Sequence, residues 1–248
     1  MIYALGDIHG NLKRVRELVE GMGLRGDTII QVGDFGMGYH PANDRRNLQN
    51  LNEYLAGKEC TLWAIRGNHD DPTFFDGRFT MSNLRLVRDY TTAEIEGLRF
   101  LFCGGATSID RTYSIERMMV AESFGHTEPC YWPGECFVLR TDLLEGAGRL
   151  DVVVTHTAPE WCHPDNKDGF GDFVTEFFAD DPKLEGDLRK ERADMSEMFR
   201  LISGSGARLH LYGHFHQRST TVRDGMSHRL LDVGEWASVQ GLLQGLLA

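Results

Sequence analysis

Short apolar runs alternate with amphipathic segments along the first part of the chain. Residues 2–5, 27–32 and 60–65 are apolar stretches typical of buried strands. Between them, apolar residues recur at helical spacing, first at Leu12, Val15, Leu18, Val19 and Met22, and then at Leu48, Leu51, Tyr54 and Leu55. Strands and helices that alternate in this way predict right-handed crossovers and a parallel sheet.

The rest of the chain continues the α/β pattern with less regularity. Residues 84–87, 91–95 and 98–103 predict short strands, which we expect to be antiparallel because their connections are too short for helices. Residues 150–154 predict another buried strand. Leu188, Met195, Met198, Phe199 and Ile202 predict a helix, and residues 208–212, 219–222 and 228–233 are strand-like. With no repeat or linker in view, we expect one domain spanning residues 1–248.

Two segments lack a clear period. The segment 104–148 begins with a small-residue loop at 104–111, and from Tyr113 to Gly148 we expect two short helices around the turn at Pro129–Pro133. The segment 157–185 is rich in Asp, Gly and Phe and is interpreted as a long loop over a functional site. Its phenylalanines either stack on a base or pin the loop to the core, and we prefer the second interpretation. These residues are Phe170, Phe173, Phe177 and Phe178.

Composition narrows the class of protein. A hydrophobic share of 41% and a charged share of 25% are ordinary for a soluble globular chain. The formal charge of −11 argues against binding to long nucleic acid, although bound cations would still permit small phosphorylated substrates. Five scattered cysteines favour a reduced, cytoplasmic setting, and no apolar segment indicates a signal peptide or a membrane partner. The oligomeric state is left open.

Polar side chains follow five of the apolar runs. Four of these groups have a glycine directly before them, which lets the backbone turn sharply and approach other groups closely. Loops that leave the carboxyl ends of parallel strands form sites at one edge of a sheet. We therefore expect the five groups to meet. They are Asp7 with His9, Asp34, Asn68 with His69, His156, and His214 with His216.

Carboxylate oxygen and imidazole nitrogen together suit first-row divalent metals. Two such ions about 3.5–4 Å apart can hold the attacking and leaving oxygens of a phosphoryl displacement. That reaction needs a proton donor for the leaving oxygen, and His69 is placed beside a ligand to serve. Asp70 is a second candidate for a catalytic role, in which it would orient His69, and a turn cap is the equal alternative. Arg66 is expected to support a strand end.

The order of these motifs resembles the signature of the calcineurin-like metallophosphoesterases, over residues 6–216. The resemblance implies a four-layer α/β/β/α sandwich with a dimetal site at one end. It implies that Asp34 bridges two ions and that His69 contacts the phosphate and protonates the leaving group, with a bridging hydroxide as nucleophile. The remaining implied ligands are Asp7, His9 and His216 for one ion, and Asn68, His156 and His214 for the other.

The second motif departs from one branch of that family. Protein phosphatases and symmetrical dinucleoside-tetraphosphate hydrolases extend it to Gly-Asp-x-x-Asp-Arg-Gly, whereas residues 33–38 here read Gly-Asp-Phe-Gly-Met-Gly. This makes phosphoprotein substrates less expected and suggests another phosphate-binding cation. Arg111 is the candidate, with a surface salt bridge as the alternative. The segment 104–111 also resembles small phage and bacterial members, some of which cleave phosphodiesters, including cyclic nucleotides.

The expected function is hydrolysis of a small phosphorylated or nucleotide ester by a dimetal phosphodiesterase with some monoesterase activity. Mn²⁺ is the first expectation for the metal, and Fe, Zn, Co, Ni or Mg would also fit. The alternatives are a phosphomonoesterase or protein phosphatase, and a non-catalytic scaffold with the same fold. The remaining histidines are given no role: His40, His126 and His163 are expected to be exposed, and His210 and His228 structural.

Overall fold

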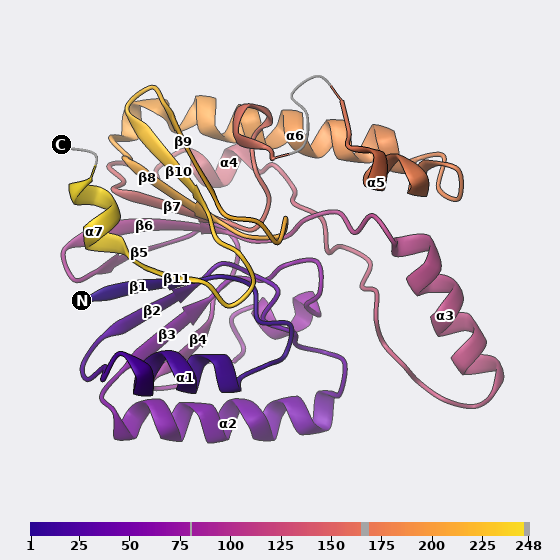
Figure 1. Ribbon diagram of the computed structural model, residues 1–248, viewed down its shortest axis with the longest axis horizontal. Helices are drawn as coiled ribbons and strands as arrows, with labels where there is room; N and C mark the ends of the chain where they lie inside the picture. Colours follow the sequence, from indigo (N-terminus) through magenta and orange to yellow (C-terminus); the bar gives the residue numbers. More distant parts are fainter. Residues whose placement is uncertain (80, 165–168, 246–248) are drawn as a thin grey trace.

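Two β-sheets face each other, and helices cover their outer surfaces (Figure 1). The computed structural model describes residues 1–79, 81–164 and 169–245. Helices α1 (Lys13–Gly21) and α2 (Pro41–Gly57) pack on the first sheet, and α6 (Leu184–Leu201) with the short α4 (Thr141–Leu144) packs on the second. This arrangement is the predicted four-layer α/β/β/α sandwich.

The first sheet is built mainly from the N-terminal part of the chain. Its strand order is β11-β1-β2-β3-β4, with β1 to β4 parallel and β11 antiparallel to β1. The strands are β1 (Ile2–Leu5), β2 (Thr28–Gln31), β3 (Thr61–Ala64), β4 (Leu84–Leu86) and β11 (Trp236–Ser238). The antiparallel pairing expected for the strand at 84–87 was wrong. β4 pairs parallel with β3 because the connection between them, which includes a 3₁₀ turn at Pro72–Phe75, crosses back along the sheet, and β5 belongs to the other sheet.

The second sheet has the order β5-β6-β7-β8-β10-β9. Its four central strands are parallel, and the edge strands β5 and β9 run antiparallel to their neighbours. The strands are β5 (Thr91–Ile95), β6 (Leu98–Cys103), β7 (Val152–Thr155), β8 (Leu209–Tyr212), β9 (Ser219–Arg223) and β10 (Met226–Leu230). The antiparallel pairing expected between residues 91–95 and 98–103 is confirmed.

Alternate residues of the central strands pack into two different hydrophobic layers, one between the sheets and one beneath the helices. On β2, Ile30 packs between the sheets with Phe100 and Phe102, whereas Ile29 packs beneath α1 and α2. Strands buried on both faces are continuously apolar, which is why these runs were visible in the sequence. All five cysteines are free, as expected. A single domain over 1–248 stays a prediction.

The first irregular segment has the two expected helices, α3 (Arg111–Ser123) and α4, on either side of its proline turn, and the second contains more helix than the sequence pattern indicated. In 104–148 the first helix, α3, projects from the sandwich (Figure 1) and exposes Tyr113, Met119 and Phe124. Within 157–185, short helical turns occur at Glu160–Cys162, Asp172–Thr175 (α5) and Glu176–Phe178, and residues 165–168 lie outside the described part of the chain. Phe170, Phe177 and Phe178 pack against Val174, Leu184 and Leu188, which supports the interpretation that they pin this segment to the core.

Two further elements complete the description. A 3₁₀ turn at Ser203–Ser205 follows α6, and α7 (Val239–Gln244) closes the described chain. Among the described residues, none of the helices combines the length and the apolar character needed to cross a lipid bilayer.

Candidate metal centre

The loops that follow β1, β2 and β8 bring four predicted ligands to one place. Asp7, His9, Asp34 and His216 each offer one ligand atom, and these four atoms all lie within 4.8 Å of one another. The Nε2 atoms of His9 and His216 are 2.9 Å apart. His216 Nε2 is 3.5 Å from Asp7 Oδ2, and His9 Nε2 is 3.8 Å from Asp34 Oδ2. The spacing suits a shared cation.

The other predicted ligands form a second group beside the first. Asn68 Oδ1 lies 3.1 Å from His156 Nε2 and 2.9 Å from His214 Nδ1. His156 Nε2 is also 3.2 Å from Asp34 Oδ1. Asp34 therefore faces both groups, one through each carboxylate oxygen, which is the arrangement that a bridging ligand requires.

The buried side chains of this centre present more hydrogen-bond acceptors than donors. Asp7 and Asp34 are buried, and Asp7 Oδ1 and Asp34 Oδ2 have no hydrogen-bond partner within the described chain. His156 Nδ1 lies 2.8 Å from the carbonyl oxygen of Val32, so Nδ1 carries a proton and donates it. In the neutral ring, Nε2 then presents a lone pair to two oxygens, an arrangement that is stable only with a cation or an extra proton between them. The residues present therefore fit a pair of divalent metals.

Several side chains of the centre have pKa values far from their usual ones. Burial raises the pKa of Asp7 to about 8 and lowers the pKa of His9 to about 4. Burial opposes the charge of His156, but the neighbouring Asp34 raises the pKa of that imidazole to about 9. Without a cation, protons on Asp7 and His156 thus offset the negative charge of the buried carboxylates. Metal binding would displace those protons.

Four of the predicted ligands have an unusual backbone. His9, Asp34, His214 and His216 have φ angles of 45°, 53°, 73° and 48°, in the left-handed region that non-glycine residues rarely adopt. Such conformations persist where the surrounding structure enforces them, and they cluster at functional sites. Two of the preceding glycines are needed for clearance: a Cβ at Gly67 or Gly213 would lie 2.0 Å from a carboxylate oxygen of Asp34 or Asp7.

His69 is held by a residue that the sequence analysis missed. Its Nδ1 lies 2.9 Å from the hydroxyl of Tyr39, and its backbone N–H donates to Asp34 Oδ1 at 2.8 Å. Tyr39 packs edge-on against Trp132. Burial raises the pKa of Tyr39 well above its usual range, so the phenol keeps its proton. The sequence offered one hint of this role. Tyr39 directly follows the two positions at which the protein-phosphatase branch has aspartate and arginine, and which are Met37 and Gly38 here.

The contacts of Asp70 favour the structural interpretation. Its carboxylate accepts hydrogen bonds from the backbone N–H groups of Phe35, Gly36, Met37 and Gly67, at 2.6–2.9 Å. These bonds hold the loop after β2 against the loop after β3. The orientation of His69 that was considered for Asp70 is provided by Tyr39, and the catalytic role proposed for Asp70 finds no support in its contacts.

Two arginines are engaged in ion pairs and hydrogen bonds. Arg66 supports the end of β3, as predicted, because its guanidinium reaches Asp89 and the carbonyl oxygen of Cys136. The guanidinium of Arg111 is bound by Asp181 at 2.5 Å and by Asp187 at 2.7 Å. These contacts match the salt-bridge alternative, and the substrate-binding role suggested for Arg111 stays a prediction that they do not favour.

A second line of residues behind the ligands also escaped the sequence analysis. The side-chain amide of Asn68 donates to Ser108 Oγ at 2.9 Å, and the Ser108 N–H donates to the carboxylate of Glu135 at 2.8 Å. The first bond orients Asn68 so that its oxygen faces His156 and His214. The signal in the sequence was weak, because a serine and a glutamate in irregular segments have no distinguishing pattern.

A cavity of about 390 Å³ opens beside the centre. Asp34, Asn68, His69, His214 and His216 line it on the metal side, and Ile109, Phe170, Phe173 and Phe177 line an apolar wall. His163 also lines this cavity and packs on Phe215, so the expectation that it is exposed was wrong. His40 and His126 are exposed, as expected. The cavity joins a polar reaction centre to an apolar surface.

Comparisons with solved structures give distant likenesses. A Staphylococcus aureus protein assigned as a 5′-nucleotidase has 12% identity and a TM-score of 0.47, over 94% of this chain and 48% of that one. The phosphopantetheinyl hydrolase of Mycobacterium tuberculosis has 16% identity and a TM-score of 0.44, over 94% and 89%. GAP50, the anchor in the inner membrane complex of Plasmodium, has 13% identity and a TM-score of 0.43, over 94% and 71%.

Similarities at this level carry no information about substrate. Among curated proteins there is no significant match. The sequence profile of the calcineurin-like phosphoesterases, in contrast, matches residues 1–218, a stretch that contains every residue of the centre described above. On that match, the chain belongs to the calcineurin-like phosphoesterase family.

Proposed function

We propose that this protein hydrolyses phosphate esters with the help of two divalent cations, Mn²⁺ being the first choice. The supporting observation is the excess of buried acceptor atoms at the centre, above all the unpartnered oxygens of Asp7 and Asp34. Asp7, His9 and His216 would hold one ion, Asn68, His156 and His214 the other, and Asp34 both. The placement of these side chains supports that division.

When bound, a pair of divalent cations supplies Lewis acidity and a nucleophile at neutral pH. The chain supplies the proton for the leaving oxygen. Because the Nδ1 atom of His69 is engaged by Tyr39, Nε2 is the nitrogen left to face the substrate in the cavity. As a general acid His69 would act as the imidazolium, whose Nδ1–H donates to the Tyr39 hydroxyl oxygen while its Nε2–H faces the leaving oxygen; the ring is left neutral after that proton has moved.

The proposed substrates are small phosphodiesters, including cyclic nucleotides or other nucleotide esters, with phosphomonoesters as slower substrates. The second motif lacks the Asp-Arg pair found in the protein-phosphatase branch, and the cavity beside the centre has an aromatic wall. We further propose a single domain in which the segments 104–148 and 157–185 border the site, and a cytoplasmic location based on the free cysteines.

The decisive assay compares a bis-ester with a mono-ester chromogenic substrate on the Mn²⁺-loaded protein, followed by a panel of cyclic and linear nucleotide esters. Faster turnover of the bis-ester supports the proposal. Faster turnover of the mono-ester favours the phosphomonoesterase alternative. Two bound ions with no turnover on any ester would identify a scaffold and overturn the proposal.

Asp34→Asn tests the bridging assignment. The variant should lose nearly all activity and bind both ions more weakly, because one negative charge shared by two cations is removed. Turnover and metal content by elemental analysis measure the two effects. Asp44→Asn is the matched control: Asp44 is a buried acid near the same loop, and its Oδ2 accepts N–H groups of Gly38 and His40. Full metal occupancy and wild-type turnover in Asp34→Asn would exclude a bridge.

His69→Ala tests the proton donor. The variant should keep both ions and lose rate, most severely on esters with poor leaving groups, because an activated leaving oxygen departs without a proton. The loss for one general acid is roughly 10²–10⁴-fold. Turnover on alkyl and nitrophenyl esters of the same acid gives the comparison. Equal losses on both esters would mean that His69 has another role.

A further inference from the structure

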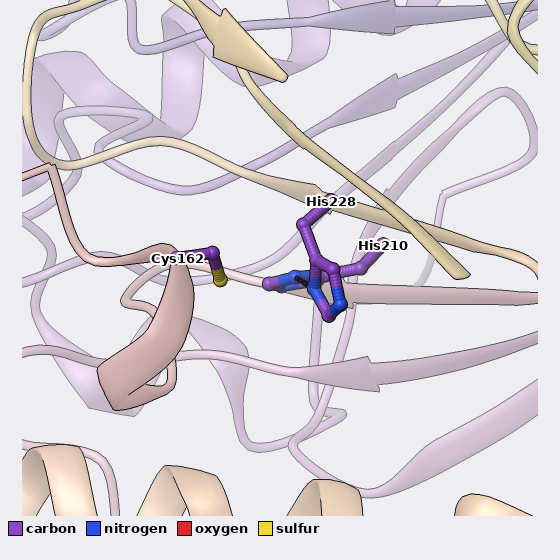
Figure 2. Close-up of side chains that lie close together, drawn as sticks. All are labelled: Cys162, His210 and His228. Carbon is purple, nitrogen blue, oxygen red and sulfur yellow. Dashed lines mark hydrogen bonds between the residues drawn. The ribbon is translucent and has the colours of Figure 1, made fainter. Parts of the chain in front are cut away.

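A buried cysteine and two buried histidines meet on the second sheet, and none of them belongs to the centre described above. His210 lies on β8, His228 on the neighbouring β10, and Cys162 in the turn that follows β7. Their exposed fractions are 0%, 2% and 4%. Figure 2 shows the sulfur and the two rings around one small space. One ligand atom from each residue lies within 4.8 Å of the other two.

The proton positions on His210 follow from its neighbours. The Thr155 hydroxyl donates its only proton to the carbonyl oxygen of Thr157, at 2.6 Å. It must therefore accept at its other contact, the Nε2 of His210 at 2.7 Å, so Nε2 carries the proton. Burial lowers the pKa of His210 well below its usual value, so the ring is neutral. Its Nδ1 consequently bears a lone pair, held in place by an outer partner as in metal-ligating histidines.

His228 completes a close pair of nitrogens. Its Nδ1 lies 3.0 Å from the Nδ1 of His210 and, without a cation, carries the proton that joins them. Its Nε2 lies 3.4 Å from the indole nitrogen of Trp161, a long contact to a residue that is partly exposed. Trp161 can exchange this bond for water, which would free Nε2 to take up the ring proton in place of Nδ1.

We propose that Cys162, His210 and His228 bind a further cation of the zinc type, which ties the turn after β7 to strands β8 and β10. Thiolate with two imidazoles is a soft to borderline donor set that suits Zn²⁺ and contains no carboxylate. Two nitrogens at about 2.0–2.1 Å from a tetrahedral Zn²⁺ lie roughly 3.3–3.4 Å apart. The observed 3.0 Å requires only a small separation of the rings.

Binding of the cation would move the His228 proton and release the thiol proton of Cys162. The His228 proton moves from Nδ1 to Nε2, the His210 proton stays on Nε2, and the thiol proton of Cys162 leaves to solvent. The cation takes the place of the proton between the two Nδ1 atoms, and a water would fill the fourth position. Burial raises the pKa of the Cys162 thiol to about 12, so the thiolate forms only with the cation present.

Co²⁺ provides a probe that separates this site from the phosphoesterase centre. A thiolate bound to Co²⁺ absorbs in the near ultraviolet by charge transfer, and the predicted ligands of the phosphoesterase centre include no sulfur. Metal-stripped full-length protein titrated with Co²⁺ should develop this band with one equivalent bound at the thiolate. The band should persist in Asp34→Asn and vanish in Cys162→Ser. Cys60→Ser, which removes an equally buried thiol elsewhere, should leave it unchanged.

A second measurement guards against a folding defect in the serine variant. Zn²⁺ should raise the melting temperature of Asp34→Asn more than that of Asp34→Asn with Cys162→Ser added, with the same circular dichroism spectrum in both. Absence of the charge-transfer band in the wild type, or its survival in Cys162→Ser, would overturn the proposal. The residues would then form a neutral hydrogen-bonded relay from Trp161 to Thr157. Neither result depends on phosphoesterase activity.

Discussion

The hydrogen bonds around His69 and Asn68 show how individual side chains prepare the centre. Tyr39 decides which nitrogen of His69 faces the cavity, and Ser108 decides which end of the Asn68 amide faces His156 and His214. Neither supporting residue touches the proposed substrate position directly. Each acts by holding the side chain of His69 or Asn68 in one orientation. Removing Tyr39 or Ser108 should therefore lower the rate of hydrolysis and leave the fold intact.

Tyr39→Phe should slow the hydrolysis of alkyl esters about tenfold while leaving nitrophenyl esters nearly unchanged. The lost hydrogen bond is worth about 1–1.5 kcal/mol, and it holds the ring of His69 in the orientation in which Nε2–H faces the leaving oxygen. Turnover on the two ester classes and metal content by elemental analysis provide the measurement. Tyr113→Phe, on the exposed face of α3, is the control. A uniform loss on both classes, or loss of metal, would contradict this role for Tyr39.

The residues of the centre were predictable to different degrees. The seven proposed ligands stand after apolar runs, and the loops that follow parallel strands of one sheet meet at one edge. That rule covers the loops after β1, β2 and β3, but not their meeting with the loops after β7 and β8, which belong to the second sheet. Tyr39, Ser108 and Glu135 act through contacts between loops that are distant in sequence, and a local pattern contains no such information. Arg111 kept two interpretations because an arginine suits a phosphate and a pair of carboxylates equally, and its ion pairs with Asp181 and Asp187 match the second one.

Among the elements, the loops after β2 and β3 behave as one unit because Asp70 joins them. Its two oxygens accept four backbone N–H groups, three from the first loop and one from its own. Asp34, Asn68 and His69 are carried by these loops. The relative placement of the two ligand groups thus depends on a carboxylate that makes no contact with the substrate.

Asp70→Asn should destabilise the fold by about 2–4 kcal/mol, because an amide nitrogen would face N–H groups that need an acceptor. Urea unfolding followed by circular dichroism measures the change. Asp71→Asn is the matched control, since Asp71 caps only the exposed N–H of Thr73. If Asp70→Asn unfolds like the wild type and loses turnover alone, Asp70 has the catalytic role that its contacts do not suggest.

Helices and strands were predictable where apolar residues recur at a regular helical or strand spacing. The parallel order of the first three strands followed from two amphipathic helices between apolar runs. The partner of β4 did not, because three residues carry no signal for which sheet they join. β11 and α7 were missed for the same reason: three- and six-residue elements form only because a sheet edge and an apolar surface are already present.

At the scale of the whole molecule, buried carboxylates make stability depend on pH. Glu135 is fully buried, and one of its oxygens has no hydrogen-bond partner in the part of the chain that the structure describes. Burial raises the pKa of Glu135 from 4.5 to about 8. Between these values the folded protein keeps a proton that the unfolded chain has lost, so stability should fall as the pH rises from 4.5 to 8.

Glu135→Gln should therefore be more stable than the wild type at pH 9, by on the order of 3 kcal/mol, and similar to it at pH 4.5, where both states of the wild type hold the proton. Urea unfolding at several pH values, with one metal content throughout, gives the comparison. Glu116→Gln, an exposed acid on α3, should show no such difference. Parallel pH profiles for the wild type and Glu135→Gln would show that Glu135 ionises normally.

The antiparallel strand β11 and the turn before it support the loop that follows β1. The N–H of Gly6 donates to the carbonyl oxygen of Glu235, and the N–H of Gly234 donates to the carbonyl oxygen of Asp7. The residue pair Gly234 and Glu235 thus fixes the loop that carries Asp7, more than 220 positions away in the sequence. A chain that ended at residue 218 would carry all seven proposed ligands, yet Asp7 would lack this backbone support. The first sheet would lack its edge strand β11, and the second would lack both β10 and β9. Hydrolytic activity should therefore require the strands after residue 218, although that part of the chain supplies none of the proposed ligands.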